Sequence, residues 1–244
     1  NMNKNYIIIY GGSSLISKEL LKILSKDFNN FIIFCRNKNI VQQYIHELKL
    51  ENLEINILEA DLLDLEKNIS FIEKFENNIL GLIWVSGFTG NPDVEYLDTN
   101  KCEANLRINF INPVLLINKI LPKMKTGNKS FLAVLTSVAG LKGRSKRLFY
   151  SSAKSGLINY LSGLRQKLSK EKINVITIIP GYMNTKPFNI KAPSFLISSP
   201  EKSARIIYNA IKKEKEIVYI NFFWKIIMFC INLIPEKIFK KFNF

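Results

Sequence analysis

A tyrosine and a lysine four residues apart offer the clearest chemistry in this sequence. Tyr150 and Lys154 stand at positions i and i+4 of a Tyr-Ser-Ser-Ala-Lys segment, so on a helix they share one face. A tyrosine hydroxyl with a pKa of about 10 exchanges protons poorly at neutral pH, but a neighbouring ammonium group stabilises the phenolate and lowers that pKa. Ser137, thirteen residues before Tyr150, could polarise a carbonyl group. The three side chains predict general acid–base chemistry at a carbonyl oxygen.

A glycine turn near the start of the chain is typical of nucleotide binding. Gly11 and Gly12 follow an apolar run at residues 6–10 and precede two serines that can cap a helix. In doubly wound folds this junction binds pyrophosphate through helix N-terminal N–H groups. A strict GxGxxG pattern is absent. We expect the following residues to contact a dinucleotide: Gly11, Ser13, Ser14, Leu15 and Ile16.

Two charged residues further along favour a dinucleotide with a 2′-phosphate. Arg36 follows the second apolar run, where the adenosine ribose would lie, and a cation there suits the phosphate. Asp61, with Leu62 beside it, ends the third run and could accept a hydrogen bond from the adenine amine. The alternatives are a solvated strand end for Arg36 and a helix cap for Asp61. Together the two residues predict NADP(H) as the preferred cofactor, with NAD(H) as the second choice.

Apolar runs alternate with helical patterns along the chain. The predicted strands cover residues 6–10, 31–35, 53–62, 79–87, 128–137, 173–181 and 217–220, and the predicted helices 15–26, 39–50, 100–125, 149–170 and 200–213. Elements at this spacing form a parallel sheet covered on both faces. We therefore predict an α/β fold: one Rossmann-like doubly wound catalytic domain over residues 1–220, with about seven parallel strands, and an amphipathic extension over 221–244.

The composition argues against several classes of protein. With 47% hydrophobic residues the chain is not extensively disordered, and its one histidine, His46, makes zinc sites and a Ser-His-Asp triad poor explanations. We expect no metal. Three widely spaced cysteines without a CxxC pair suit a reducing, cytoplasmic compartment, and we find no secretory signal. The charge of +15 comes with a Lys-rich composition, and we expect no nucleic-acid partner without a clustered basic patch.

The order of these motifs resembles that of the short-chain dehydrogenase/reductase family over nearly the whole chain. YGGSSLIS stands where the family has its glycine motif, TGxxxGxG. The other matching positions follow in the family's order and spacing: Asp61, WVSG at 84–87, Asn109 in INFINP, Ser137 in TSVAG, Tyr150 with Lys154, and PGYMNT at 180–185.

The resemblance implies a Ser-Tyr-Lys-Asn tetrad that reduces a carbonyl group with a nicotinamide dinucleotide. Tyr150 would protonate the substrate oxygen, and Ser137 would orient the carbonyl. Lys154 would lower the pKa of Tyr150 and hold the nicotinamide ribose, while Asn109 would hold a water molecule in the proton relay. Further residues are implied to line the cofactor: Ser86, Gly87, Pro180, Gly181 and, at the carboxamide, Thr185.

Three residues depart from the family pattern near the cofactor. Leu15 and Ser17 replace the second and third glycines, and Trp84 opens the segment that is usually Asn-Asn-Ala-Gly. We expect Leu15 to add bulk where the cofactor approaches the backbone, and Ser17 to add a hydroxymethyl group where the helix packs on the sheet. These changes predict weaker cofactor binding or a reshaped turn.

A basic loop lies between Ser137 and Tyr150. It brings several cations to the rim of the expected pocket: Lys142, Arg144, Lys146 and Arg147. One interpretation is a clamp for a substrate phosphate, in which Lys142, Arg144 and Arg147 donate charge-assisted hydrogen bonds. The alternative is an ordinary solvated loop.

The last 24 residues combine an apolar, aromatic run with lysines. The run is too short to cross the roughly 30 Å of membrane hydrocarbon. Trp224, several phenylalanines and flanking lysines suit a helix lying in an anionic membrane interface, at the inner face of the cell membrane. The alternative is a helix at a subunit interface, and we expect a homo-oligomer.

The tail and basic loop are similar to one branch of that family, the keto-reductase component of the decaprenylphosphoryl-ribose 2-epimerase system. This similarity implies reduction of a keto-sugar carried on a polyprenyl phosphate for cell-envelope polysaccharide, with a partner oxidase supplying the ketone. Two other hypotheses stay open. One is a soluble carbonyl or keto-acyl reductase whose tail joins subunits. The other is a non-catalytic dinucleotide-binding scaffold subunit, for which the departures at Leu15, Ser17 and Trp84 argue.

Overall fold

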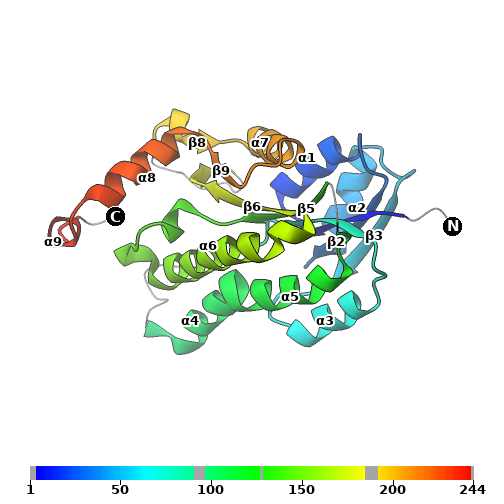
Figure 1. Cartoon of the computed structure of the whole chain (residues 1–244), viewed down its shortest axis with the longest axis horizontal. Helices are drawn as coiled ribbons and strands as arrows, with labels where there is room; N and C mark the ends of the chain where they lie inside the picture. Colours follow the sequence, from blue (N-terminus) through cyan, green and yellow to red (C-terminus); the bar gives the residue numbers. More distant parts are fainter. Residues whose placement is uncertain (1–3, 91–96, 127–128, 185–191, 243–244) are drawn as a thin grey trace.

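A seven-stranded parallel sheet forms the centre of the protein, as predicted (Figure 1). The computed structural model describes residues 4–90, 97–126, 129–184 and 192–242. The strand order is β3-β2-β1-β4-β5-β6-β9. The bounds are β1 Tyr6–Tyr10, β2 Asn30–Cys35, β3 Glu54–Glu59, β4 Ile79–Trp84, β5 Ser130–Leu135, β6 Ile173–Pro180 and β9 Ile217–Ile220. This α/β arrangement is the Rossmann-like doubly wound sheet expected from the sequence.

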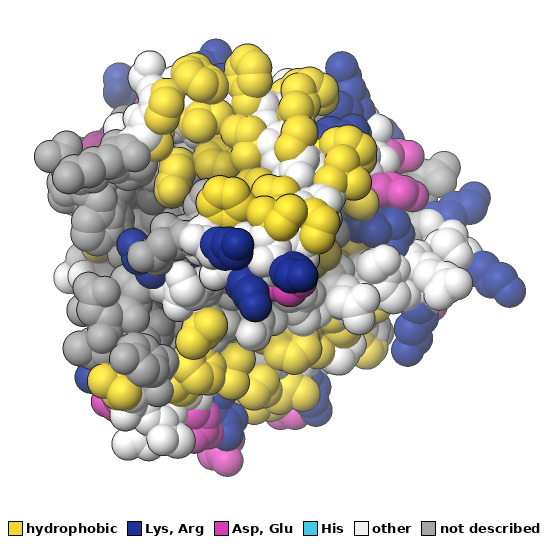
Figure 2. Space-filling model, turned by 90° about the vertical axis from the view of Figure 1, so that its left-hand side faces the viewer, with side chains coloured by type: hydrophobic (Ala, Val, Ile, Leu, Met, Phe, Trp, Pro, Cys, Tyr) yellow, Lys and Arg dark blue, Asp and Glu magenta, His cyan; other side chains and the backbone are white. Residues whose placement is uncertain are grey.

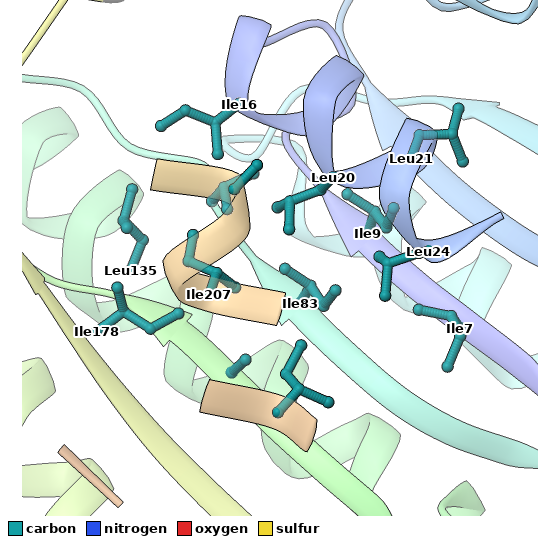
Figure 3. Close-up of a cluster of buried hydrophobic side chains, with 14 of the residues drawn as sticks. Ile7, Ile9, Ile16, Leu20, Leu21, Leu24, Ile83, Leu135, Ile178 and Ile207 are labelled. Carbon is teal, nitrogen blue, oxygen red and sulfur yellow. The ribbon is translucent and has the colours of Figure 1, made fainter. Parts of the chain in front are cut away.

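Helices cover both faces of the sheet. On one face lie α1 (Leu15–Leu24), α2 (Lys38–Glu47) and α7 (Pro200–Lys212), and on the other α3 (Leu65–Glu73), α5 (Asn112–Ile120) and α6 (Leu148–Leu168), with α4 (Thr99–Leu106) beside α6 (Figure 1). Side chains of β1 alternate between the two cores: Ile7 and Ile9 pack toward α1 and α7, and Ile8 toward α5 and α6. Figure 3 shows the first of these cores. Burial on both sides explains why the strands are continuous apolar runs.

Several boundaries differ from the prediction. The helix predicted over 100–125 is divided into α4, a π-helical turn at Arg107–Ile111, and α5. The short helix α3 was not predicted, because little more than Ile72 and Asn68 is buried along it and its periodic signal is weak. The strands predicted over 53–62, 79–87 and 128–137 end two or three residues earlier, so polar residues at their ends belong to loops.

The C-terminal segment forms helix α8 (Phe223–Leu233) and the short α9 (Glu236–Phe239), at one end of the molecule (Figure 1). Trp224 and Met228 of α8 pack with Val138 and Ile179 in a third apolar cluster. A two-stranded sheet of β7 (Tyr182–Met183) and β8 (Ile197–Ser198) lies nearby in sequence. Within the described parts of the chain, no helix has both the length and the apolar character needed to cross a bilayer.

Candidate active site

The predicted site residues follow the carboxyl ends of neighbouring strands. In an open parallel sheet these ends meet at one edge, where ligands bind at the point of strand-order reversal. Strand β1 ends at Tyr10 before the glycine turn, β4 at Trp84 before Ser86 and Gly87, and β5 at Leu135 before Ser137. Because β1, β4 and β5 are adjacent, their polar ends are brought together.

Ser137, Tyr150 and Lys154 converge on one another. The hydroxyl of Tyr150 forms a hydrogen bond with the side chain of Ser137. The Ser137 Oγ also accepts a hydrogen bond from the Ala139 N–H at 3.1 Å, which fixes its rotamer. Lys154 Nζ lies 5.8 Å from the centre of the Tyr150 ring and donates to the Leu135 carbonyl at 3.4 Å. Helix α6 carries the tyrosine and lysine one turn apart, as their spacing predicted.

Burial shifts the pKa values of both catalytic candidates. It raises the pKa of Tyr150, while the hydrogen bond from Ser137 and the positive charge of Arg147 act in the opposite direction. Burial also lowers the pKa of Lys154 to about 8, because an ammonium group loses hydration inside the protein. From the sequence we predict that Lys154 controls the pKa of Tyr150; in the structure the groups that lower this pKa are Ser137 and Arg147, and the role of Lys154 stays a prediction.

Asn109 anchors the loop after β4. Its amide nitrogen donates to the Phe88 carbonyl at 2.7 Å and to the Asn105 side chain at 2.9 Å, and its Oδ1 accepts from the Phe88 N–H at 3.1 Å. A Cβ atom at Gly87 would lie 3.2 Å from both Asn109 Oδ1 and Lys154 Nζ, so Gly87 sits against the two side chains. The π-helical turn that contains Asn109 is a form often found at functional sites. The implied water in a proton relay stays a prediction.

Both glycines of the turn after β1 are required by its geometry. Gly11 has a φ of 95°, and a Cβ there would meet the Ser86 nitrogen at 2.9 Å. A Cβ at Gly12 would meet the Ile33 side chain at 2.2 Å. These contacts press the turn against the loop after β4 and against β2, leaving the start of α1 at the sheet edge.

The structure accommodates the three departures from the pattern of the family that the sequence resembles, at Leu15, Ser17 and Trp84. Ser14 caps α1 by accepting the Ser17 N–H at 3.1 Å, and the buried Ser17 hydroxyl donates to the Gly11 carbonyl at 2.8 Å, which closes the turn. The Leu15 side chain is 42% exposed. Trp84 is fully buried and stacks on Tyr10 with ring centres 4.2 Å apart, in the core on the α5 side of the sheet. None of the three breaks the strand, turn and helix arrangement.

The turn fits a dinucleotide. The N–H groups of Leu15 and Ile16 belong to the first turn of α1, where a helix has no acceptors of its own, so they can bind a phosphate. Arg36 is exposed directly after β2. Asp61 is exposed too, and one of its carboxylate oxygens accepts the Leu63 N–H at 2.8 Å, while the cap of α3 is Asp64.

Two buried asparagines hold the loop after β3 through hydrogen bonds to its backbone. Asn112 donates to the carbonyl of the buried Leu62 at 2.6 Å, and Asn68 donates to the Asp61 carbonyl at 2.7 Å. These bonds fix the backbone that presents the Asp61 carboxylate. Of the predicted cofactor residues, Thr185 lies outside the described residues.

The buried position of Trp224, next to the predicted cofactor residue Gly181, was not predicted from the sequence. The last residues of β6 are followed by Gly181, where a Cβ would fall 1.9 Å from Trp224 Nε1. That nitrogen donates to the Leu196 carbonyl at 3.0 Å. The prediction that Trp224 anchors the tail in a membrane interface is wrong, because the side chain is only 5% exposed and packs against Gly181. Gly181 is visible in the sequence, but nothing there indicates that Trp224 packs against it.

Two of the three cations of the predicted phosphate clamp hold other parts of the protein. Lys142 Nζ bonds Glu236 at 2.7 Å and lies 4.6 Å from the centre of the Phe239 ring, which ties the loop to α9. Arg147 Nη1 donates to the carbonyls of Thr89 at 2.8 Å and Gly90 at 3.2 Å. Of these three cations, Arg144 is the one that remains a candidate for binding a substrate phosphate.

Replacing Arg147 with glutamine should raise the pKa of Tyr150, because the nearby positive charge is lost. The family resemblance implies that Tyr150 donates its proton to a carbonyl oxygen, a role that needs the protonated form, so we expect the alkaline limb of the kcat/KM profile for reduction to move to higher pH. For the reverse reaction, oxidation of the alcohol, the acidic limb of the kcat/KM profile should also move to higher pH. The measurement is kcat/KM in both directions across neutral and alkaline pH, with Lys146→Gln in the same loop as control. Unchanged limbs in Arg147→Gln would contradict this role.

A broad hollow at the opposite edge of the sheet carries no comparable chemistry. It is lined by residues at the amino ends of β5 and β6 and by Arg165 of α6. The Arg165 guanidinium is committed to the Val175 carbonyl, the Thr177 hydroxyl and the Glu216 carbonyl. In the described part of the chain, no three His, Cys, Asp or Glu side chains are grouped so as to hold a metal ion.

A doubly wound parallel sheet with a glycine turn after β1 and a Ser–Tyr–Lys group at its carboxyl edge defines a dinucleotide-dependent oxidoreductase. Residues 5–192 match the family described as short chain dehydrogenase. The chain therefore belongs to that family and is an NAD(P)-dependent oxidoreductase.

Relatives and solved structures agree with this assignment. An uncharacterised oxidoreductase of Mycobacterium tuberculosis is 23% identical over 239 residues, 96% of each chain. A 3-oxoacyl-[acyl-carrier-protein] reductase of Bos taurus is 24% identical over 177 residues, which cover 72% of this chain and 75% of that one. The fold is similar to that of a short chain dehydrogenase from Burkholderia cenocepacia solved with NADP, with a TM-score of 0.81 at 15% identity and coverage of 98% and 97%.

Proposed function

We propose that the protein uses NADPH to reduce a ketone to a secondary alcohol. The observation that carries this proposal is the hydrogen-bonded pair of Ser137 and Tyr150, with Lys154 one helical turn beyond the tyrosine. The family membership argues against the alternative of a non-catalytic scaffold subunit.

The chain's own residues supply binding, orientation and a proton. When bound, the dinucleotide supplies the hydride. The first-turn N–H groups of α1 would hold its pyrophosphate, and Lys154 its nicotinamide ribose. The Ser137 hydroxyl donates a hydrogen bond to the substrate carbonyl and so fixes the oxygen beside Tyr150. The Tyr150 hydroxyl then delivers its proton to that oxygen, and the ammonium group of Lys154 stabilises the phenolate that remains.

Replacing Arg36 with aspartate should move cofactor preference from NADPH toward NADH. The change removes a cation suited to the 2′-phosphate and adds an acceptor suited to a free 2′-hydroxyl. A hydrogen bond to a charged group contributes about 1.5–3 kcal/mol, so the ratio of the two Kd values should shift by roughly 10–150-fold. Fluorescence titration with each dinucleotide measures it. Lys119→Asp, with the same charge change on α5, should leave the ratio alone. An unchanged ratio in Arg36→Asp would remove that residue from phosphate recognition.

We further propose that the ketone belongs to a keto-sugar carried on a polyprenyl phosphate, delivered by a partner oxidase at the inner face of the cell membrane. The apolar, lysine-bearing tail supports this substrate, since α8 packs directly beside the Ser137 loop through Val138. The similarity to 3-oxoacyl reductases supports a keto-acyl thioester as the alternative.

The rate of NADPH consumption, measured separately with each of the two candidate substrates, decides between the keto-sugar and the keto-acyl proposals. We expect a higher kcat/KM for the 2-keto-pentofuranosyl lipid phosphate than for a 3-oxoacyl thioester. Higher efficiency with the thioester would replace the keto-sugar by the keto-acyl substrate. Turnover of neither compound, with NADPH bound, would call for another ketone.

A further inference from the structure

Helix α8 buries one face and leaves the other uncovered. Trp224 and Met228 point into the protein, while the outward residues are 48–67% exposed. These outward residues, with Ile238 and Phe242 after them, make up what we call the α8 surface: Phe222, Phe223, Ile226, Phe229, Leu233, Ile238 and Phe242. Figure 2 shows hydrophobic side chains gathered at this end of the molecule. Scattered exposed apolar residues are ordinary, but a contiguous group of large ones marks an interaction site.

The charges around the α8 surface are almost all positive. Lys225 lies within α8, and Lys237, Lys240 and Lys241 follow in and after α9; all four are exposed. The only acidic residue in this segment is Glu236, and it is paired with Lys142. Figure 2 shows Lys and Arg side chains bordering the apolar group. Exposed aromatic and apolar side chains edged by lysines complement the surface of a bilayer that contains anionic lipids.

A second copy of the chain suits this surface less well. A two-fold contact would place the same lysines against one another, in a chain of net charge +15. An anionic lipid surface accepts both the apolar side chains and the lysines. Helix α8 has 11 residues, so it can lie in the interface but cannot cross the membrane.

The α8 surface adjoins the active site. Phe195 extends it, with its ring 5.4 Å from that of Phe223. Tyr182, which is also exposed, contacts the inward Trp224 at 5.3 Å and directly follows Gly181. The apolar area therefore runs from the tail to the loop that ends β6.

We infer that the α8 surface binds the protein to an anionic phospholipid bilayer, which brings the neighbouring carboxyl edge of the sheet, with its candidate site, close to the lipid. The benefit of membrane binding rests on the proposed function, since a ketone on a lipid carrier could then reach the site from the membrane. Membrane binding by itself requires only the apolar side chains and lysines described above.

The test is co-sedimentation of the full-length protein with vesicles of phosphatidylcholine alone or mixed with phosphatidylglycerol. We expect binding to the mixed vesicles only, weakened by added salt. The double variant Phe229→Ser with Leu233→Ser should lower the partition coefficient at least tenfold, since both side chains are about two-thirds exposed and neither supports the core. The triple change of Lys237, Lys240 and Lys241 to glutamine should lower it to a similar degree. Leu97→Ser with Leu115→Ser, two exposed leucines away from α8, should leave it unchanged.

Two results would overturn the inference. One is equal sedimentation of the wild type and the Phe229/Leu233 variant. The other is no sedimentation of the wild type, together with a dimer that the same variant dissociates, which would assign the surface to a second copy. Reduction of a water-soluble ketone, measured on the same samples, separates the two proposals. Activity without vesicle binding would reject the membrane inference alone, and binding without any reductase activity would reject the proposed function alone.

Discussion

Replacing Tyr150 with phenylalanine is expected to lower the rate of ketone reduction about 10³-fold while the Kd for NADPH stays within about twofold of the wild type. The substitution removes the hydroxyl that hydrogen-bonds Ser137 and keeps the ring beside Lys154. Steady-state consumption of NADPH gives the rate, and fluorescence titration gives the affinity. The two readouts separate loss of the proton donor from loss of the cofactor.

Tyr160→Phe is the matched control. Tyr160 lies on the same helix α6, and its hydroxyl donates to Asn118 at 2.9 Å, away from the site. That variant should keep its activity within a few-fold, because it loses one partly exposed hydrogen bond, worth about 1 kcal/mol of folding stability. If Tyr150→Phe retained activity within about tenfold of the wild type, general acid catalysis, worth roughly 10²–10⁴-fold, would have to come from another group.

Replacing Lys154 with methionine should abolish turnover and make the folded protein more stable at neutral pH. Burial lowers the pKa of Lys154 from 10.5 to about 8, which corresponds to a cost of roughly 3 kcal/mol for holding the charge inside the folded protein. Methionine fills a similar volume without a charge. The lost hydrogen bond to the Leu135 carbonyl offsets part of the gain, so we expect a net stabilisation of about 2 kcal/mol.

The stability that Lys154→Met gains over the wild type should decrease as the pH rises. Below pH 8 the lysine is protonated in the folded and unfolded states alike, so the full cost of the buried charge is present and methionine gains most. Between pH 8 and 10.5 the folded protein releases the proton and the unfolded chain keeps it, so the wild type recovers stability and the difference narrows. Urea unfolding of both proteins at neutral and alkaline pH measures this.

Lys167→Met, at an exposed position of the same helix, should show no such pH-dependent gain. A Lys154→Met protein that is less stable than the wild type at neutral pH would mean that the ammonium group is held by favourable contacts that outweigh its burial.

The sheet was predictable because each central strand is buried on both faces and must be apolar throughout. Ile7, Ile8 and Ile9 leave no other interpretation of the first strand once a glycine turn follows. The grouping of Ser137 with Tyr150 followed from the same logic, since a strand end and a following helix define one sheet edge. In contrast, the Arg107–Ile111 segment has an ordinary helical pattern, and neither its π-helical turn nor the hydrogen bond from Asn109 to the distant Phe88 carbonyl can be read from that pattern.

Side-chain contacts between residues far apart in the chain could not be predicted from the sequence. Lys142 has several plausible partners, and its contact with Glu236, 94 residues later, depends on where α9 lies. The sequence left two explanations for Trp224, a membrane interface and a subunit interface, because a large aromatic side chain suits both. Its burial within the protein depends on the space beside Gly181 and on the cluster with Val138 and Ile179, which only the fold reveals.

The contact between Gly181 and Trp224 also limits how this protein can change through evolution. With a Cβ at position 181 the indole would have to leave, and without the indole the backbone after β6 would face a void. Either single replacement therefore lowers stability, whereas a small residue at 224 combined with alanine or serine at 181 restores the fit. In descendants of this chain the two positions should be inherited as a pair.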